Sequence, residues 1–151
     1  MKRLLLVCAM LFVACASYAQ QPLNVWIKLP STISTNGIVS GTTNLPDGTI
    51  LAIGIMGTAG SAFNSDPACD ALGGPTVAVS HGKFGPVGLG GTYGCLTPGM
   101  YSFEVVMRAP FMQPPNVIAV IGKNGENLVG PLVKRGGMDN DVQAIVPVEV
   151  R

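Results

Sequence analysis

Apolar residues in this chain come in short runs that glycine and proline interrupt, and no amphipathic pattern lasts long enough for a helix of three turns. The 20 glycines and 12 prolines break regular structure at short intervals. A strand needs only about four to eight residues, so it fits between such breaks where a longer helix does not. The spacing therefore predicts an all-β fold.

Apolar and polar residues alternate in several segments, and this alternation locates the strands. The strongest pattern lies at 100–107, where one face carries Tyr101, Phe103, Val105 and Met107. Further strands are expected at 23–29, 38–44, 49–56, 76–80, 117–121, 128–133 and 142–150, and Phe84 opens one more. The segment 49–56 is apolar on both faces, which favours a central strand, whereas Pro147 favours a sheet edge for the last strand.

Turn residues separate these segments. Residues 45–48 and 81–83 have turn composition, and Asn124 followed by Gly125 is the usual pair in a tight hairpin. A short helical turn fits 67–72. About seven or eight strands joined by such turns predict an antiparallel β-sandwich of the immunoglobulin-like or transthyretin-like kind. A closed barrel is the alternative.

Residues 1–19 have the pattern of a secretory signal peptide. Lys2 and Arg3 are followed by an apolar run at 4–14 and then by small residues that end at Ala19, where we expect cleavage. The apolar run is too short to cross the roughly 30 Å hydrocarbon core of a bilayer, so no transmembrane anchor is expected. The chain is predicted to be exported, to the periplasm or outside the cell.

The mature part, residues 20–151, has the size of one domain. Cys15 offers a competing lipid-anchor site, which the bulky Phe12 fits poorly. Cleavage leaves seven Lys or Arg against eight Asp or Glu, and only Lys134 and Arg135 are adjacent. Neutralising phosphates requires clustered basic residues, so the composition excludes nucleic acid as the partner.

Two of the four cysteines leave with the signal peptide, and Cys69 and Cys95 remain. In an oxidising compartment an isolated pair of this kind predicts a disulfide, which would stabilise the fold by roughly 3 to 4 kcal/mol on the chain-entropy model. The alternative is two buried free thiols.

The sequence has few residues that could perform catalysis or bind a metal. His81 is the single histidine, which excludes a multi-histidine zinc site and a histidine relay. The sequence has no Gly-x-Ser-x-Gly elbow, and oxidised cysteines provide no thiolate. We therefore expect no catalytic, cofactor-binding or metal-binding residue, and a protein that is not an enzyme.

Two partial patterns leave an alternative open. Asp66 with Asp70, and Asp139 with Asp141, offer oxygen ligands for calcium without completing a calcium-loop motif. The dispersed methionines suit copper, although core packing is expected to account for most of them. The alternative function is thus a periplasmic carrier of a small ligand or metal, calcium or copper, using the loop region between the two cysteines.

A proline-rich connection at 108–115 contains two large apolar side chains, Phe111 and Met112. They either fold back over the edge of the core, which is the arrangement we favour, or stay exposed as a contact patch for a partner.

Three strings occur in an order that resembles a group of small, uncharacterised exported bacterial proteins: Gly41-Thr-Thr-Asn-Leu-Pro-Asp-Gly-Thr49, Gly82-Lys-Phe84 and Pro98-Gly-Met-Tyr101. A Pro-Gly-x-Tyr string before a strand is also similar to transthyretin-like and immunoglobulin-like modules, in which the tyrosine hydroxyl holds a turn. The resemblance covers most of the mature chain and implies a fold, with no activity attached to it.

A complete scaffold without a catalytic set predicts a non-catalytic binding or structural module. Its expected partner is another envelope or extracellular protein, contacted through loops or a sheet edge. Phe111 and Met112 are the candidate contact residues.

Overall fold

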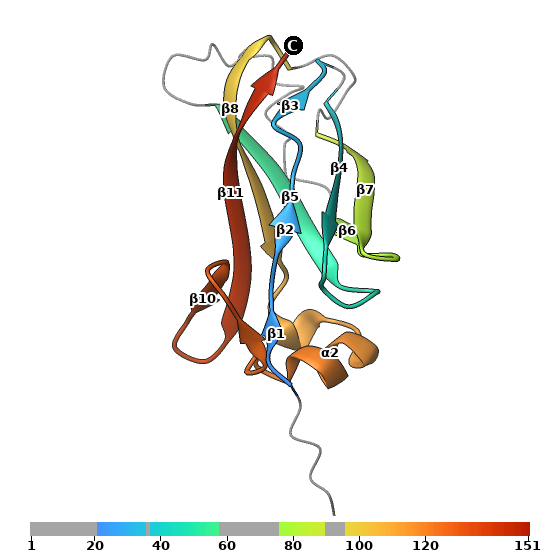
Figure 1. Cartoon of the computed structure of the whole chain (residues 1–151), viewed down its shortest axis with the longest axis vertical. Helices are drawn as coiled ribbons and strands as arrows, with labels where there is room; N and C mark the ends of the chain where they lie inside the picture. The colour runs from blue at the N-terminus through green and yellow to red at the C-terminus, as the bar shows by residue number, and fades with distance from the viewer. Residues whose placement is uncertain (1–20, 36, 58–75, 90–95) are drawn as a thin grey trace, which may run out of the picture.

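A computed structural model of the chain describes residues 21–35, 37–57, 76–89 and 96–151 (Figure 1). Most of these residues lie in strands that form several sheets, which confirms the all-β prediction. None of the described helices is long and apolar enough to cross a membrane.

The larger sheet curls into a half-barrel. Its strands run in the order β10 (Val133–Arg135), β11 (Asn140–Val150), β8 (Gly99–Met107), β5 (Ile50–Gly57) and β6 (Thr76–Ala78), all antiparallel to their neighbours. β5 is central, as its two apolar faces predict. β3 (Thr32–Ile33) joins the same sheet by pairing in parallel with the end of β11.

A smaller sheet consists of β2 (Ile27–Lys28), β4 (Ile38–Thr43) and β7 (Lys83–Gly88) in that order. A further pair joins β1 (Leu23–Asn24) in parallel to β9 (Leu128–Val129). The N-terminal segment therefore passes from β9 to the smaller sheet and then to the larger one, and Figure 1 shows it running lengthwise between β11 and β4.

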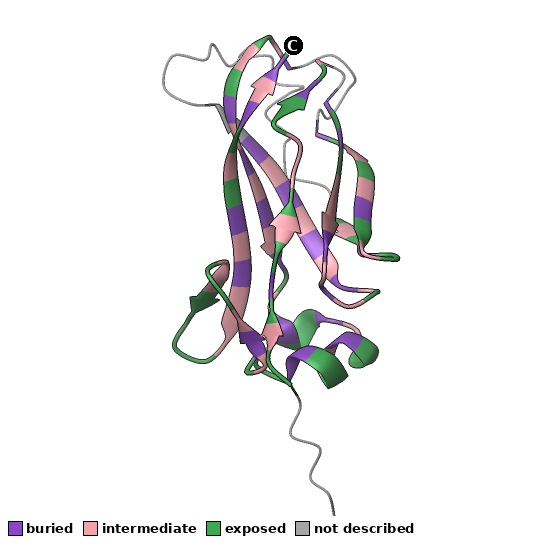
Figure 2. Ribbon diagram, viewed as in Figure 1, coloured by how far each residue is buried: buried purple, intermediate pink, exposed green. Residues whose placement is uncertain are grey.

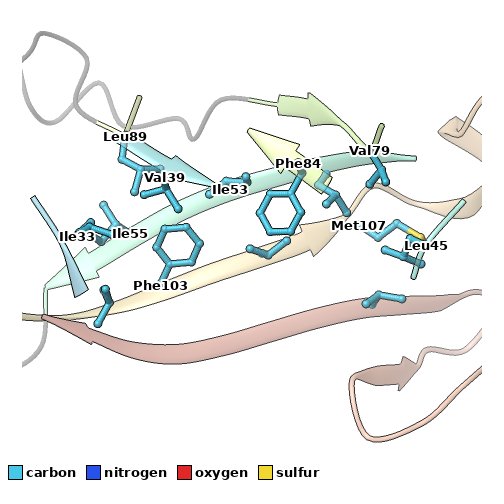
Figure 3. Close-up of a cluster of buried hydrophobic side chains, with 14 of the residues drawn as sticks. Ile33, Val39, Leu45, Ile53, Ile55, Val79, Phe84, Leu89, Phe103 and Met107 are labelled. Atoms are coloured by element: carbon cyan, nitrogen blue, oxygen red, sulfur yellow. The ribbon is translucent and has the colours of Figure 1, made fainter. Parts of the chain in front are cut away.

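Side chains from both sheets form one hydrophobic cluster. Phe84 and Val39 contribute from the smaller sheet, and Phe103 and Ile53 from the larger one, all of them at most 1% exposed (Figure 3). Buried and less buried residues alternate along the strands in Figure 2. The face predicted for 100–107 is confirmed, because Tyr101, Phe103, Val105 and Met107 are all buried.

Tyr101 also holds the turn before β8. Its hydroxyl donates a hydrogen bond to the carbonyl oxygen of Thr97 at 2.9 Å, while its ring is buried in the core. The arrangement is the one that the Pro-Gly-x-Tyr string implies.

The segment 117–121 is a helix and not the expected strand. α2 spans Pro115–Ile121, with Pro114 and Pro115 at its start, where a missing N–H costs nothing and a fixed φ suits the first turn. Val117 and Ile121 are spaced by one helical turn and are both fully buried. Asn124 and Gly125 consequently form part of the connection from α2 to β9 rather than a hairpin between strands.

Other expected strands are divided. Residues 23–29 form β1 and β2, and 128–133 contributes to β9 and β10. The described residues contain eleven strands, several of only two residues, and two of the pairings are parallel rather than antiparallel. Parallel pairing arises because the N-terminal segment pairs with strands far away in the sequence, where no hairpin dictates the direction.

Several predictions lie outside the described residues. These are the signal peptide at 1–19 with Cys15, the helical turn at 67–72, the acids Asp66 and Asp70, and the cysteines Cys69 and Cys95.

Candidate partner-contact surface

Phe111 and Met112 lie in the 3-10 helix η1 (Pro110–Met112), which follows β8 at the same end of the molecule as α2 (Figure 1). Their exposed fractions are 63% and 50%. The expectation that they fold back over the core is therefore wrong. Pro110 and Gln113, on either side of them, take the inward positions instead, and Figure 2 shows the mixture of exposed and buried residues here.

Gln113 attaches this segment to the larger sheet. Its side-chain oxygen accepts a hydrogen bond from the Ile50 backbone N–H at 2.8 Å. Its side-chain nitrogen donates to the Ile50 carbonyl at 3.1 Å and to the Arg108 carbonyl at 2.7 Å. The amide thus acts as a strand partner for the first residue of β5. Only 4% of Gln113 is exposed.

α2 is fixed by further contacts. Asn116 donates from its side-chain nitrogen to the carbonyl of Asp47 at 2.9 Å, which ties the helix to the turn before β5. Asn127 donates to the Val120 carbonyl at 3.0 Å, and Val117 is fully buried. The two helices therefore form a fixed platform at this end of the molecule.

The connection after α2 is closed by Glu126. Its carboxylate accepts a hydrogen bond from the Asn124 backbone N–H at 2.8 Å. Hydrogen bonds from its own backbone N–H and from that of Asn124 lower the pKa of Glu126, against a smaller opposite effect of burial.

The platform has the composition of a contact surface. Residues 109–122 contain no charged residue, and Val120 on α2 is also 41% exposed. Protein interfaces are depleted of charges at their centre and enriched in aromatic residues and methionine. We call the exposed set Phe111, Met112 and Val120 the η1–α2 surface. Gln113 attaches this surface to the larger sheet. In the sequence it is only a polar residue among prolines, and no motif indicates this role.

Those residues considered for chemistry that the structure describes are not brought together. His81 lies exposed in the turn between β6 and β7, with its Nδ1 3.0 Å from the Oγ of the adjacent Ser80. Across the described ranges, no group of three His, Cys, Asp or Glu could hold a metal ion. Asp141 has one buried oxygen without a hydrogen-bond partner, whereas Asp139 is exposed.

The methionines differ from expectation. Met107 is in the core, but three others with described side chains are largely exposed, on β8, on η1 and in the β10–β11 connection: Met100, Met112 and Met138. Core packing therefore does not account for most of them, and their different elements do not form a joint copper site.

No protein-family model, curated protein or solved structure matches this chain.

Proposed function

We propose that this protein is a non-catalytic, exported binding or structural module that contacts another envelope or extracellular protein through the η1–α2 surface. The observation that carries the proposal is the exposure of Phe111 and Met112 beside a buried Gln113 with three hydrogen bonds to the sheet. Two large apolar side chains are thereby presented to solvent from a fixed backbone.

A fixed platform matters for affinity. Ordering a flexible loop on binding costs free energy, and a loop that is already ordered avoids this cost. A few residues near the centre of an interface, often aromatic ones, contribute most of its binding energy. Removing water from uncharged residues around them costs little free energy, and interface centres are accordingly poor in charges. Phe111 is the residue expected to contribute most.

The immunoglobulin-like form of the sandwich is the one we favour. In such domains one sheet contains strands A, B and E, the other contains G, F, C and C′, and a tyrosine near the start of strand F bonds back to the preceding turn. The order β2-β4-β7 supports the first sheet and β11-β8-β5-β6 the second. Tyr101, at the start of β8 with its bond to Thr97, supports the corner.

This assignment would place the η1–α2 surface in the F–G connection, and the turn at 45–48 in the B–C connection. Both belong to the binding end of immunoglobulin variable domains. The hydrogen bond from Asn116 to Asp47 joins the two connections here. Domains of one fold bind unrelated partners, so the assignment concerns the position of the surface and not the identity of the partner.

A pull-down from the native envelope fraction tests the proposal. The double variant Phe111→Ser/Met112→Ser is expected to lose a specific partner that the natural chain recovers, at unchanged thermal stability, because both side chains are exposed. The matched control is Met138→Ser/Ile145→Ser, which removes two apolar side chains, 90% and 54% exposed, from other elements. Equal recovery by the natural chain and the first variant would contradict the assignment.

A further inference from the structure

The single tryptophan of the chain, Trp26, lies directly before β2 of the smaller sheet and is 42% exposed. Tryptophan is usually largely buried, so its partial exposure calls for a physical reason. Its backbone is held on both sides. The Trp26 N–H donates to Oδ1 of Asn44 at 2.9 Å, and the Thr43 hydroxyl donates to the Trp26 carbonyl at 2.8 Å.

Two lysines lie on one face of the smaller sheet. Lys28 of β2 and Lys83 of β7 lie directly opposite Thr42 of β4, one on each side, and both are exposed. Directly opposed residues share a face, and neighbouring strands are about 4.8 Å apart, so the two lysine Cα atoms are separated by roughly 10 Å. Two positive charges and a hydroxyl thus form a row across the sheet, beside the indole ring.

No carboxylate neutralises this row within its own sheet. Strands β2, β4 and β7 contain no Asp or Glu. In the adjoining turns, the carboxylate of Asp47 faces the Gly82 N–H at 3.4 Å. Among the described residues, the one ion pair joins Arg151 to Glu149, on other elements. The larger sheet differs, because its outward face includes Glu104 bonded to Gln143.

The ammonium of Lys28 lies over the Trp26 ring, 5.5 Å from its centroid. At an exposed site such a cation–π contact is weak and easily exchanged for a stronger one. An arriving anion would draw Lys28 away and uncover the ring. The contact therefore covers the ring of the free protein without blocking a ligand.

We propose that this face, formed by Trp26, Lys28, Thr42 and Lys83, binds an acidic glycan, a sugar chain that bears carboxylates. A sugar ring has an apolar C–H face that fits a flat indole and a polar rim that fits hydroxyls and ammonium groups. The proposal is independent of the η1–α2 surface and adds a second class of partner to the one proposed there.

Other anionic partners fit the face less well. An anionic membrane is recognised by clusters of about four to eight basic residues, and only two lie here. The Asp and Glu side chains of an acidic peptide would pair with Lys28 and Lys83 but carry no ring that could stack on the indole. Of these three partners, the glycan is the one that uses both the aromatic and the basic residues.

Because Trp26 is the single tryptophan, its fluorescence reports on this face directly. Titration of the purified protein with oligogalacturonate is expected to change the emission saturably, and added NaCl should weaken binding because exposed charges are screened. A neutral maltooligosaccharide of equal length, polyglutamate and phosphatidylglycerol vesicles are the comparisons. Absence of a saturable change with oligogalacturonate, or equal binding of any comparison, would overturn the proposal.

Variants localise the site. Lys28→Ala/Lys83→Ala should weaken oligogalacturonate binding by roughly tenfold, whereas the control Lys123→Ala/Lys134→Ala, with two exposed lysines elsewhere, should leave it unchanged. Trp26→Ala, followed by calorimetry because the fluorophore is gone, should lose binding by a similar factor. Circular dichroism checks that each variant is folded. Equal weakening by the control pair would show general charge attraction and would exclude this face as the site.

Discussion

Gly41 of β4 shows how a single residue makes room for a neighbouring side chain within the smaller sheet, because it lies directly opposite Phe84 of β7. A Cβ atom at this position would overlap the ring of Phe84 and lie 2.8 Å from the carbonyl oxygen of Lys28. Phe84 is among the largest fully buried side chains, so it has no free space into which to move. Glycine here is required by packing and not by a turn.

Gly41→Ala is expected to lower the free energy of unfolding by about 1 to 3 kcal/mol, because the added methyl overpacks the core. The matched control is Gly54→Ala on β5, where a Cβ would meet nothing within 4 Å. Alanine there should be neutral or stabilising by about 0.5 kcal/mol, since glycine weakens a strand interior. Urea unfolding of both variants measures the difference, and equal effects would contradict the packing argument.

Glu126 gives the fold a pH dependence of known sign. Backbone N–H groups lower its pKa in the folded state, so its carboxylate stabilises the fold above the unfolded value of about 4.5, and this contribution is lost as pH falls through the lowered pKa. Glu126→Gln should therefore melt below the natural chain at neutral pH and with it in acid. Thermal melts across this range are the measurement, and a gap that persists in strong acid would contradict the assignment.

For single residues, the sequence predicted which face of a strand is buried better than it predicted which side chains form hydrogen bonds. The alternation along β8 placed Tyr101 and Phe103 correctly, because a period of two leaves only one way to bury an apolar face. It did not predict Gln113, whose three partners are backbone groups of Ile50 and Arg108. Which backbone groups lack a strand partner is known only once the sheets are formed.

Among the elements, η1 depends most on one side chain. Gln113→Ala would leave the Ile50 N–H and the Arg108 carbonyl without these bonds at a partly buried site, whereas the Ile50 carbonyl keeps its bond from the Arg108 N–H at 3.1 Å. We expect a loss of about 3 kcal/mol in unfolding free energy. Asn116→Ala, which removes one exposed hydrogen bond to Asp47, should cost about 1 kcal/mol. Calorimetric melts rank the two, and the reverse order would show that α2 and not Gln113 fixes the platform.

α2 marks where the sequence was ambiguous. Residues 117–121 are apolar and partly β-branched, and a run of this length suits a strand as well as a buried helix. Pro114 and Pro115 settle the outcome, because they preset the first turn while Val117 and Ile121 bury one helical face. Proline interrupts a helix or strand at most positions, but it is favoured in the first turn of a helix.

In the whole molecule, the all-β class followed from local patterns, but the path of the N-terminal segment did not. In this segment β1 pairs with β9, β2 with β4, and β3 with β11. The strands β9 and β11 are more than a hundred residues away from their partners in the sequence. Such pairings depend on which edges remain open after the sheets assemble. The immunoglobulin-like or transthyretin-like subtype accordingly stays a prediction.

Between its pairings with β10 and β3, β11 has a stretch with no strand partner among the described residues on the side away from β8. The backbone N–H groups of Gln143 and Glu149 bond to Leu132 and Ser31 at 2.9 Å, so odd-numbered residues of β11 face away from β8. Pro147 lies between these two bonds on the same edge, where it provides no N–H. The last strand is not the edge strand that Pro147 predicts, because β11 lies between β10 and β8. The proline itself occupies the stretch between the pairings with β10 and β3, where a missing N–H opposes strand addition by another chain.

Pro147→Val should therefore increase self-association, because it restores a donor next to the Ile145 N–H on this edge and completes a template for a second β11. Sedimentation velocity over a range of protein concentrations measures the shift. Ser102→Val is the matched control, since Ser102 lies directly opposite Pro147 on β8 and receives the same side chain with no change in backbone donors. If both variants self-associate to the same extent, the added apolar surface causes the association. Pro147 would then have no specific role in preventing strand addition at β11.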